Sequence, residues 1–188
     1  MATSTQVRSG GAVPAVIGAI ERAVGAIRWL ARPSLAQLAL RVALAVPFWK
    51  SGILKWQGFL KLNDTAVALF TDEFKLHLPG GPYDYPAPAA MAFLTGCGEI
   101  LFPVLLVLGL ATRFAAAGLL VMTCIVELTV PDGWPIHITW AAMALGIMAW
   151  GPGKLSADNA LRGLAGGGAE AAGRPAVSAA AATRRKTR

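Results

Sequence analysis

Charged residues are scarce in this sequence. Asp, Glu, Lys and Arg make up 14% of its 188 residues, whereas a soluble domain has about 25%. Apolar residues make up 55%, and the mean hydropathy is +0.56. This composition is less typical of a soluble globular domain than of a chain that lies in lipid.

Cysteine is almost absent. Cys97 and Cys124 are the two cysteines, and each lies in an apolar run without CxxC spacing. This pattern predicts neither a disulfide framework nor a metal site. Small apolar packing is the simplest role for both side chains.

The net charge of +7 raises the question of a nucleic-acid partner. The basic residues form no continuous patch with interleaved aromatics, so no nucleic-acid partner is expected. They gather instead at the two ends of the chain, in a pattern typical of membrane topology.

Four long apolar segments cover the middle of the chain, at residues 35–54, 88–110, 114–130 and 134–150. A helix needs about 20 apolar residues to cross a bilayer. The sequence therefore predicts an all-α fold, in which residues 34–152 form a four-helix transmembrane bundle in the lipid bilayer.

Residues 1–33 precede the bundle. The first 11 are small and polar, and we expect them to be disordered. Ile17, Ile20 and Val24 then recur at three- and four-residue steps, with arginines off that stripe. This spacing predicts a basic amphipathic helix that lies on the membrane surface or docks on protein.

The remaining segments lie outside the spans. In the loop after the first span, Asn63 or Asp64 can cap a short helix with one apolar side. Residues 153–188 are rich in Ala and Gly with a basic end, so we expect a disordered, basic cytoplasmic tail.

Lysine and arginine placement predicts the orientation. Basic residues stand before the first span, in the turn at Arg113 and after the fourth span, whereas residues 131–133 carry only Asp132. The positive-inside rule then places both termini in the cytoplasm, for a multi-pass protein of the cell membrane.

Ionisable side chains inside the spans are costly, so each one suggests a function. They are Arg41, Lys50, Glu99, Glu127 and His137. At about 1.5 Å of rise per residue, Arg41 lies roughly 10 Å and Glu99 roughly 16 Å from the cytoplasmic ends of their helices. An arginine side chain can bridge that difference, so an Arg41–Glu99 pair is expected.

Glu127, His137 and Lys55 fall near the outer ends of their helices. Residues 130–135 form a short Pro- and Gly-containing link, so Glu127 and His137 should lie close together. A polar pocket that opens outward explains this grouping. In the alternative, the charges only hold helices together, and Lys55 reaches to the surface.

Two motifs resemble the DoxX family. The first is Arg41 followed by FWKSGILKW at residues 48–56, and the second is Gly98-Glu99 followed by LLVLGLATR at residues 105–113. The resemblance covers roughly residues 35 to 150 and implies a compact four-helix membrane domain. It also implies an association with thiosulfate-to-quinone electron transfer and with membrane-bound oxidoreductase assemblies.

Three functions follow from this resemblance and stay open. The first is a subunit of a membrane-bound redox system acting on quinone or a small sulfur compound. In it Glu127 and His137 are the catalytic candidates that exchange protons, and Arg41, Lys55 and Glu99 bind substrate. The second is a non-enzymatic anchor or assembly partner for a soluble oxidoreductase, and the third is a small transporter or channel.

Whether the chain is an enzyme also stays open. The cofactor is unknown, with quinone as a candidate, and the oligomeric state is unknown. His77 and His137 are its two histidines, and His77 lies in a loop. A haem held across a membrane bundle usually needs paired axial ligands, so bound haem is not expected.

The predicted orientation can be tested with topology reporters. Fusions at either terminus should report a cytoplasmic location, and a fusion between Lys61 and Tyr85 an external one. A C-terminal reporter that scores as external would overturn the predicted orientation.

Overall fold

The computed structural model describes residues 12–172, with side chains placed for residues 15–164. Residues 1–11, and 173–188 of the predicted 153–188 tail, lie outside the described residues. Within these limits the chain is mostly helical. Its helices are α1 (Ala12–Leu30), α2 (Pro33–Ile53), α3 (Asp64–Ala68), α4 (Pro88–Leu108), α5 (Thr112–Thr129), α6 (Trp134–Trp150) and α7 (Ala157–Ala172).

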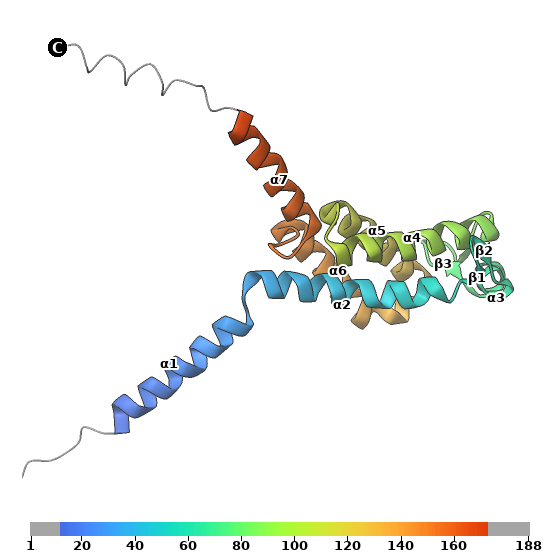
Figure 1. The fold of residues 1–188 in the computed structure, drawn as a ribbon. Coiled ribbons are helices and arrows are strands. Elements are labelled where there is room, and N and C mark those ends of the chain that lie inside the picture. Colours follow the sequence, from blue (N-terminus) through green and yellow to red (C-terminus); the bar gives the residue numbers. More distant parts are fainter. Residues whose placement is uncertain (1–11, 173–188) are drawn as a thin grey trace, which may run out of the picture.

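Four of these helices, α2, α4, α5 and α6, pack lengthwise into a bundle (Figure 1). The core between them mixes large residues, such as Leu44 and Leu119, with alanines. Ala115, Ala116 and Ala144 are fully buried and let α5 and α6 approach closely.

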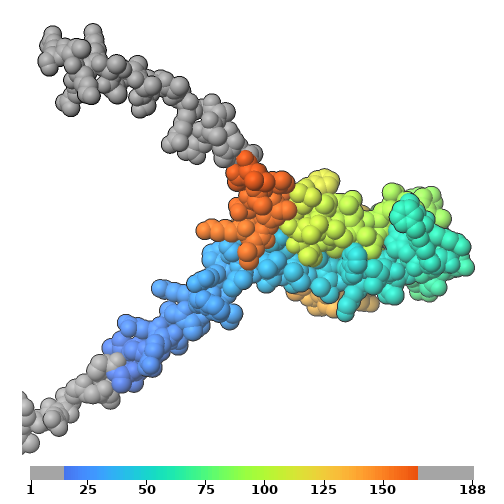
Figure 2. Space-filling model, viewed as in Figure 1, coloured from blue at the N-terminus to red at the C-terminus, as the bar shows by residue number. Residues whose placement is uncertain are grey.

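The bundle has two distinct ends (Figures 1 and 2). Helices α1 and α7 project from one of them, here called the tail end. The segment between α2 and α4 covers the opposite one, here called the loop end.

Two of the described helices, α4 and α5, are long and apolar enough to cross a membrane. Neither α2 nor α6 joins them, since α6 has 17 residues and α2 interrupts its apolar residues with Gln37, Arg41 and Lys50. Large apolar side chains on α4 and α5 face outward, among them Leu94, Leu101 and Val121. Residues 12–172 thus contain two candidate spans where the sequence predicts four.

The turn between α4 and α5 explains where α4 ends. Gly109 takes a left-handed conformation with φ of 70°, and the backbone N–H of Leu110 donates to the carbonyl of Leu105. This pattern closes a helix and favours glycine. The helix therefore ends two residues before the predicted boundary at residue 110.

The loop end contains the predicted short helix. Asn63 caps α3 by accepting a hydrogen bond from the backbone N–H of Ala66 at 2.6 Å. The chain then continues as one π-helical turn, η1 (Leu69–Glu73).

Short strands also occur at the loop end, in a structure that is otherwise mostly helical, and the sequence did not predict them. They are β1 (Trp56–Gly58) paired with β2 (Lys61–Leu62), and β3 (Lys75–Leu76) paired with β4 (Tyr83–Asp84), both antiparallel. Strands of two or three residues are too short to give an alternating hydrophobic pattern, so the sequence does not show them.

Residues 157–172 form α7, where the sequence predicts a disordered tail. The hydroxyl of Ser156 accepts from the backbone N–H of Asn159 at 3.2 Å and caps the helix. The sequence after Leu161 is rich in Ala and Gly. This composition outweighed the N-cap residue, so the helix was not predicted.

The segment that leads into α7 is fixed to the α4–α5 turn by two side chains. Arg41, fully buried, donates to the carbonyls of Leu106 and Val107 at 3.2 and 3.3 Å and to that of Leu155. The Asp158 carboxylate accepts from Ala111 N at 2.8 Å and from Thr112 N at 3.0 Å. Asp158 thus caps α5 from a distant part of the chain.

The Asp158 cap should make stability depend on pH. Burial raises the pKa of Asp158, but hydrogen bonds from Thr112 and Ala111 lower it more, so the net pKa lies below the ordinary value of 3.8. Since the folded pKa is depressed, the stabilisation is complete above pH 3.8 and is lost as the pH falls through the folded pKa.

We predict that Asp158→Ala lowers the free energy of unfolding by about 1 kcal/mol at neutral pH. The difference from the wild type should vanish in strong acid. The measurement is denaturation of the detergent-solubilised protein by sodium dodecyl sulfate. Asp72→Ala, at an exposed position of η1, is the matched control and should change little. A loss that persists unchanged in strong acid would contradict the capping role.

Candidate functional site

A buried ion pair joins Lys55, two residues after the end of α2, to Glu99 of α4 near the loop end. The Lys55 ammonium lies 2.5 Å from Oε2 of Glu99, and the two side chains are 12% and 7% exposed. Lys55 also donates to the Ser51 hydroxyl at 3.0 Å, and Ser51 donates to Oε1 of Glu99 at 3.1 Å. Each of the three side chains therefore bonds to both of the others.

Glycine makes this pairing possible. A Cβ atom on Gly52 would lie 2.9 Å from the Cβ of Glu99, and one on Gly96 would lie 2.9 Å from the ring of Trp56. Any larger side chain at Gly52 would push α2 away from α4. The close approach of the two backbones is what brings Lys55 within hydrogen-bond distance of Glu99.

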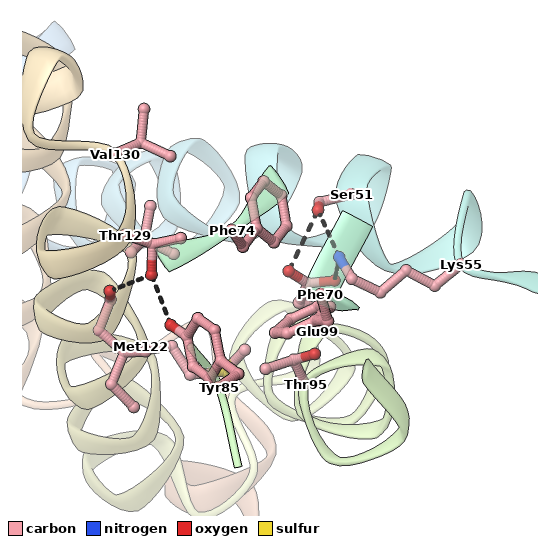
Figure 3. Close-up of a pocket in the computed structure, with 12 residues that line it drawn as sticks. Ser51, Lys55, Phe70, Phe74, Tyr85, Thr95, Glu99, Met122, Thr129 and Val130 are labelled. Carbon is pink, nitrogen blue, oxygen red and sulfur yellow. Dashed lines mark hydrogen bonds and ion pairs between the residues drawn. The ribbon is translucent and has the colours of Figure 1, made fainter. Parts of the chain in front are cut away.

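The ion pair lines a cavity of about 170 Å³ (Figure 3). One wall is polar and carries Ser51, Lys55 and Glu99. The other walls are aromatic or aliphatic, apart from a few hydroxyl groups. They consist of Phe70, Phe74, Tyr85, Thr95, Met122, Ile125, Val126, Thr129 and Val130.

The segment at the loop end covers this cavity and is tied to α5. Thr129 donates to the carbonyl of Ile125 at 2.7 Å, so in the contact of 2.6 Å between the Tyr85 and Thr129 hydroxyls Tyr85 is the donor. The backbone N–H of His77 donates to the carbonyl of Leu128 at 2.8 Å. Phe70, Phe74 and Tyr85 are thereby held over the cavity.

The predicted Arg41–Glu99 pair is absent, because each side chain has other partners. Arg41 bonds to carbonyls at the tail end, and Glu99 bonds to Lys55 and Ser51. Gly52, which contacts Glu99, lies 11 residues after Arg41, or roughly 16 Å along a helix. The prediction compared depths from the helix ends and missed how α2 and α4 are staggered.

The predicted closeness of Glu127 and His137 is confirmed. Nδ1 of His137 lies 2.8 Å from Oε2 of Glu127, and the side chains are 9% and 25% exposed. His137 also packs against Trp140, with 5.0 Å between ring centroids. The short link between α5 and α6, η2 (Pro131–Gly133), brings the two helices together as expected.

The Glu127–His137 pair does not reach the cavity. It lines a separate groove of about 240 Å³ with Thr123, Cys124 and Trp134. On α5, the groove residues Thr123 and Glu127 are turned about 100° around the helix from the cavity residues Met122 and Val126, so they lie on a different face. The five predicted site residues therefore occupy three places, and only Lys55 and Glu99 share a cavity.

Several cavity residues were missed from the sequence. Ser51, in the last turn of α2, stands four residues before Lys55, and that spacing was a usable signal. Phe70, Phe74 and Tyr85 gave no such signal, because they reach the cavity only through the path of the loop-end segment.

Lys55 and Glu99 offer the chemistry of this site. The ammonium can donate a hydrogen bond to an oxygen in the cavity, and the carboxylate can accept a proton. Within residues 12–172, no group of three or more His, Cys, Asp or Glu side chains could hold a metal ion.

Comparisons with known proteins agree with the motifs in the sequence. The family model described as DoxX matches residues 36–132, just over half of the chain. An uncharacterized protein of Haemophilus influenzae is 28% identical over 134 residues, which cover 66% of this chain and 82% of that protein. No solved structure matches.

We predict a characteristic result from a double-mutant cycle at the ion pair. Lys55→Met or Glu99→Leu alone leaves an uncompensated buried charge, which should cost about 3 to 5 kcal/mol of stability, and the double variant should recover much of it. The measurement is the free energy of unfolding in detergent.

The exposed pair Lys75–Asp84 is a matched control for this cycle. Its atoms lie 2.6 Å apart, but Asp84 is 81% exposed, so removing either partner should cost about 1 kcal/mol or less. Strictly additive losses at Lys55 and Glu99 would show that the two charges do not stabilise each other.

Proposed function

Because the chain belongs to the DoxX family of membrane proteins, we propose that it is a quinone-binding subunit of a membrane-bound redox system. In this proposal α2, α4, α5 and α6 all cross the bilayer. The ligand occupies the 170 Å³ cavity beside Lys55 and Glu99. A soluble oxidoreductase supplies or takes up the electrons.

The direction of the helices supports the proposed topology. Helices α1 and α7 leave the bundle at the same end, which is what an even number of crossings requires (Figure 1). Arginines and lysines are found at this end, including Arg28, Arg32, Lys154 and Arg162. By the positive-inside rule the tail end lies in the cytoplasm, and the cavity lies toward the outer surface.

The charge of the cavity is the observation that carries the choice of ligand. Its one ammonium, on Lys55, is already paired with the carboxylate of Glu99, so the charged wall is neutral overall. A dianion such as thiosulfate would bring buried charge that nothing compensates, at a high cost. A neutral ring with carbonyl oxygens adds no charge.

The shape and the lining of the cavity also suit such a ring. Roughly 10–15 Å³ of cavity holds one water, so about 170 Å³ admits a molecule of several heavy atoms. Phe70, Phe74 and Met122 provide apolar contacts for a planar ring, and Lys55 can donate to a carbonyl oxygen. The ammonium would also stabilise negative charge that develops on that oxygen during reduction.

Glu127 and His137 have a different role in this proposal. Their pair lies outside the cavity, on a different face of α5, and connects α5 to α6. We assign the pair the role of holding the two helices together. The proposal gives it no part in catalysis, unlike the hypothesis drawn from the sequence.

A second candidate function is a membrane anchor for a soluble enzyme. It is favoured by α1, whose Ile17, Ile20 and Ile27 are exposed by 51% to 64%, and which projects away from the bundle. As an anchor alone, the chain would retain a partner enzyme on purification but would bind no quinone.

We predict that the purified protein binds a benzoquinone with a short aliphatic tail, measured by calorimetric titration in detergent. Val126→Phe should fill the cavity and weaken binding about tenfold to hundredfold, since overpacking costs about 1–3 kcal/mol. Val121→Phe makes the same change on the outward face of α5, where Val121 is 59% exposed, and should leave binding unchanged.

Thiosulfate provides the test of the ligand class. It should neither bind nor compete with the quinone. Thiosulfate binding that Val126→Phe abolishes would replace the quinone assignment with the anionic alternative. Equal quinone affinity in all three proteins would show that the quinone does not occupy this cavity.

A further inference from the structure

A second hollow lies at the tail end, beside the turn between α4 and α5. It has a volume of about 370 Å³ and is lined by residues of that turn, of α5 and of α7. Two arginines line it, Arg113 at the start of α5 and Arg162 in the second turn of α7. Arg113 is also the last residue of the second sequence motif. It does not line the cavity at the loop end, so quinone binding there gives it no role.

The two guanidinium groups are available to a ligand. In the part of the chain with placed side chains, neither Arg113 nor Arg162 donates a hydrogen bond or forms an ion pair with a protein group within 4 Å. Arg113 lies flat over Gly151, where a Cβ would be 3.4 Å from its terminal nitrogen. The contact orients the guanidinium without using its hydrogen-bond donors.

Asp158 also lines the hollow, but its carboxylate is committed to the start of α5. It accepts three hydrogen bonds, from Ala111 N, Thr112 N and the Thr112 hydroxyl at 2.8 to 3.0 Å. With two guanidinium groups and one carboxylate, the hollow has an excess positive charge. Asp158 thus occupies the backbone N–H groups of Ala111 and Thr112, so the two arginines are the charged donors left for an anion there.

Apolar side chains adjoin these charges. Phe114 is 66% exposed and Leu161 is 54% exposed, and both line the hollow. Phe114 begins the outward apolar face of α5, one of the two candidate membrane spans. A basic hollow at the end of a span, next to exposed apolar surface, matches both parts of an anionic phospholipid.

We propose that this hollow binds the phosphate of an anionic phospholipid, held by Arg113 and Arg162, with an acyl chain along Phe114. Planar guanidinium groups suit phosphate oxygens, because they donate paired hydrogen bonds. The site requires that the tail end lies at a membrane surface. It is independent of the cavity at the loop end and of quinone binding.

Lipid binding to the full-length protein in neutral detergent tests this site, by native mass spectrometry and by the shift in melting temperature. The probes are phosphatidylglycerol, phosphatidylcholine and inorganic phosphate. Phosphatidylglycerol should bind at one saturable site and raise the melting temperature. Phosphatidylcholine and inorganic phosphate should do so at least about tenfold less effectively, because each lacks either the net charge or the acyl chain.

Arg162→Gln should weaken phosphatidylglycerol binding about tenfold, as expected for the loss of a charge-assisted contact. Because Arg162 lies on the exposed part of α7, this variant should fold like the wild type. Lys154→Gln removes the same charge at the same end, outside the hollow, and is the matched control that should retain binding.

The position of Arg113 permits one further comparison. Arg113→Lys keeps the charge but loses the paired donors, and it should bind more weakly than the wild type and more tightly than Arg113→Gln. Equal phosphatidylglycerol affinity of the wild type and Arg162→Gln would overturn the site. Equal binding of inorganic phosphate would assign the hollow to a free anion in place of a lipid.

Discussion

The buried contact between Lys55 and Glu99 is the constraint on which the loop end depends. A charge in such surroundings is tolerated only when an opposite charge and hydrogen bonds compensate it. Meeting that requirement brings α2 and α4 together so closely that only glycine fits at position 52. The same contact fixes the polar wall of the cavity, so the geometry of the proposed binding site follows from the stability of the helix pair.

The tail end solves a related problem by different means. Arg41 is fully buried without a carboxylate, and it bonds to backbone carbonyls at the end of α4 and to Leu155. Carbonyls at a helix C-terminus lack partners and carry partial negative charge, so they suit a cation. Polar contacts thus join the helices at both ends, and the core between them is left to alanine and large apolar residues.

The sequence predicted features that depend on local order along the chain. Apolar length placed α4 and α6 within a few residues, and the short link before α6 correctly brought Glu127 to His137. The sequence-based prediction failed for contacts that depend on how helices and loops are placed relative to each other. Because α2 is staggered against α4, Glu99 pairs with Lys55 and not with Arg41. The path of the loop-end segment brings Tyr85 over the cavity. Neither depends on residues near each other in the sequence.

A binding role for the cavity rests on Lys55 donating a hydrogen bond to a carbonyl oxygen of a neutral ring. Infrared difference spectroscopy of a carbonyl-labelled benzoquinone bound to the purified protein measures that bond directly. The labelled carbonyl band should move to lower frequency on binding to the wild type. It should keep its free position with the Lys55→Met/Glu99→Leu double variant, which is expected to recover much of the stability that either single change removes. A band at the free frequency in the wild-type complex would contradict the proposed role of Lys55.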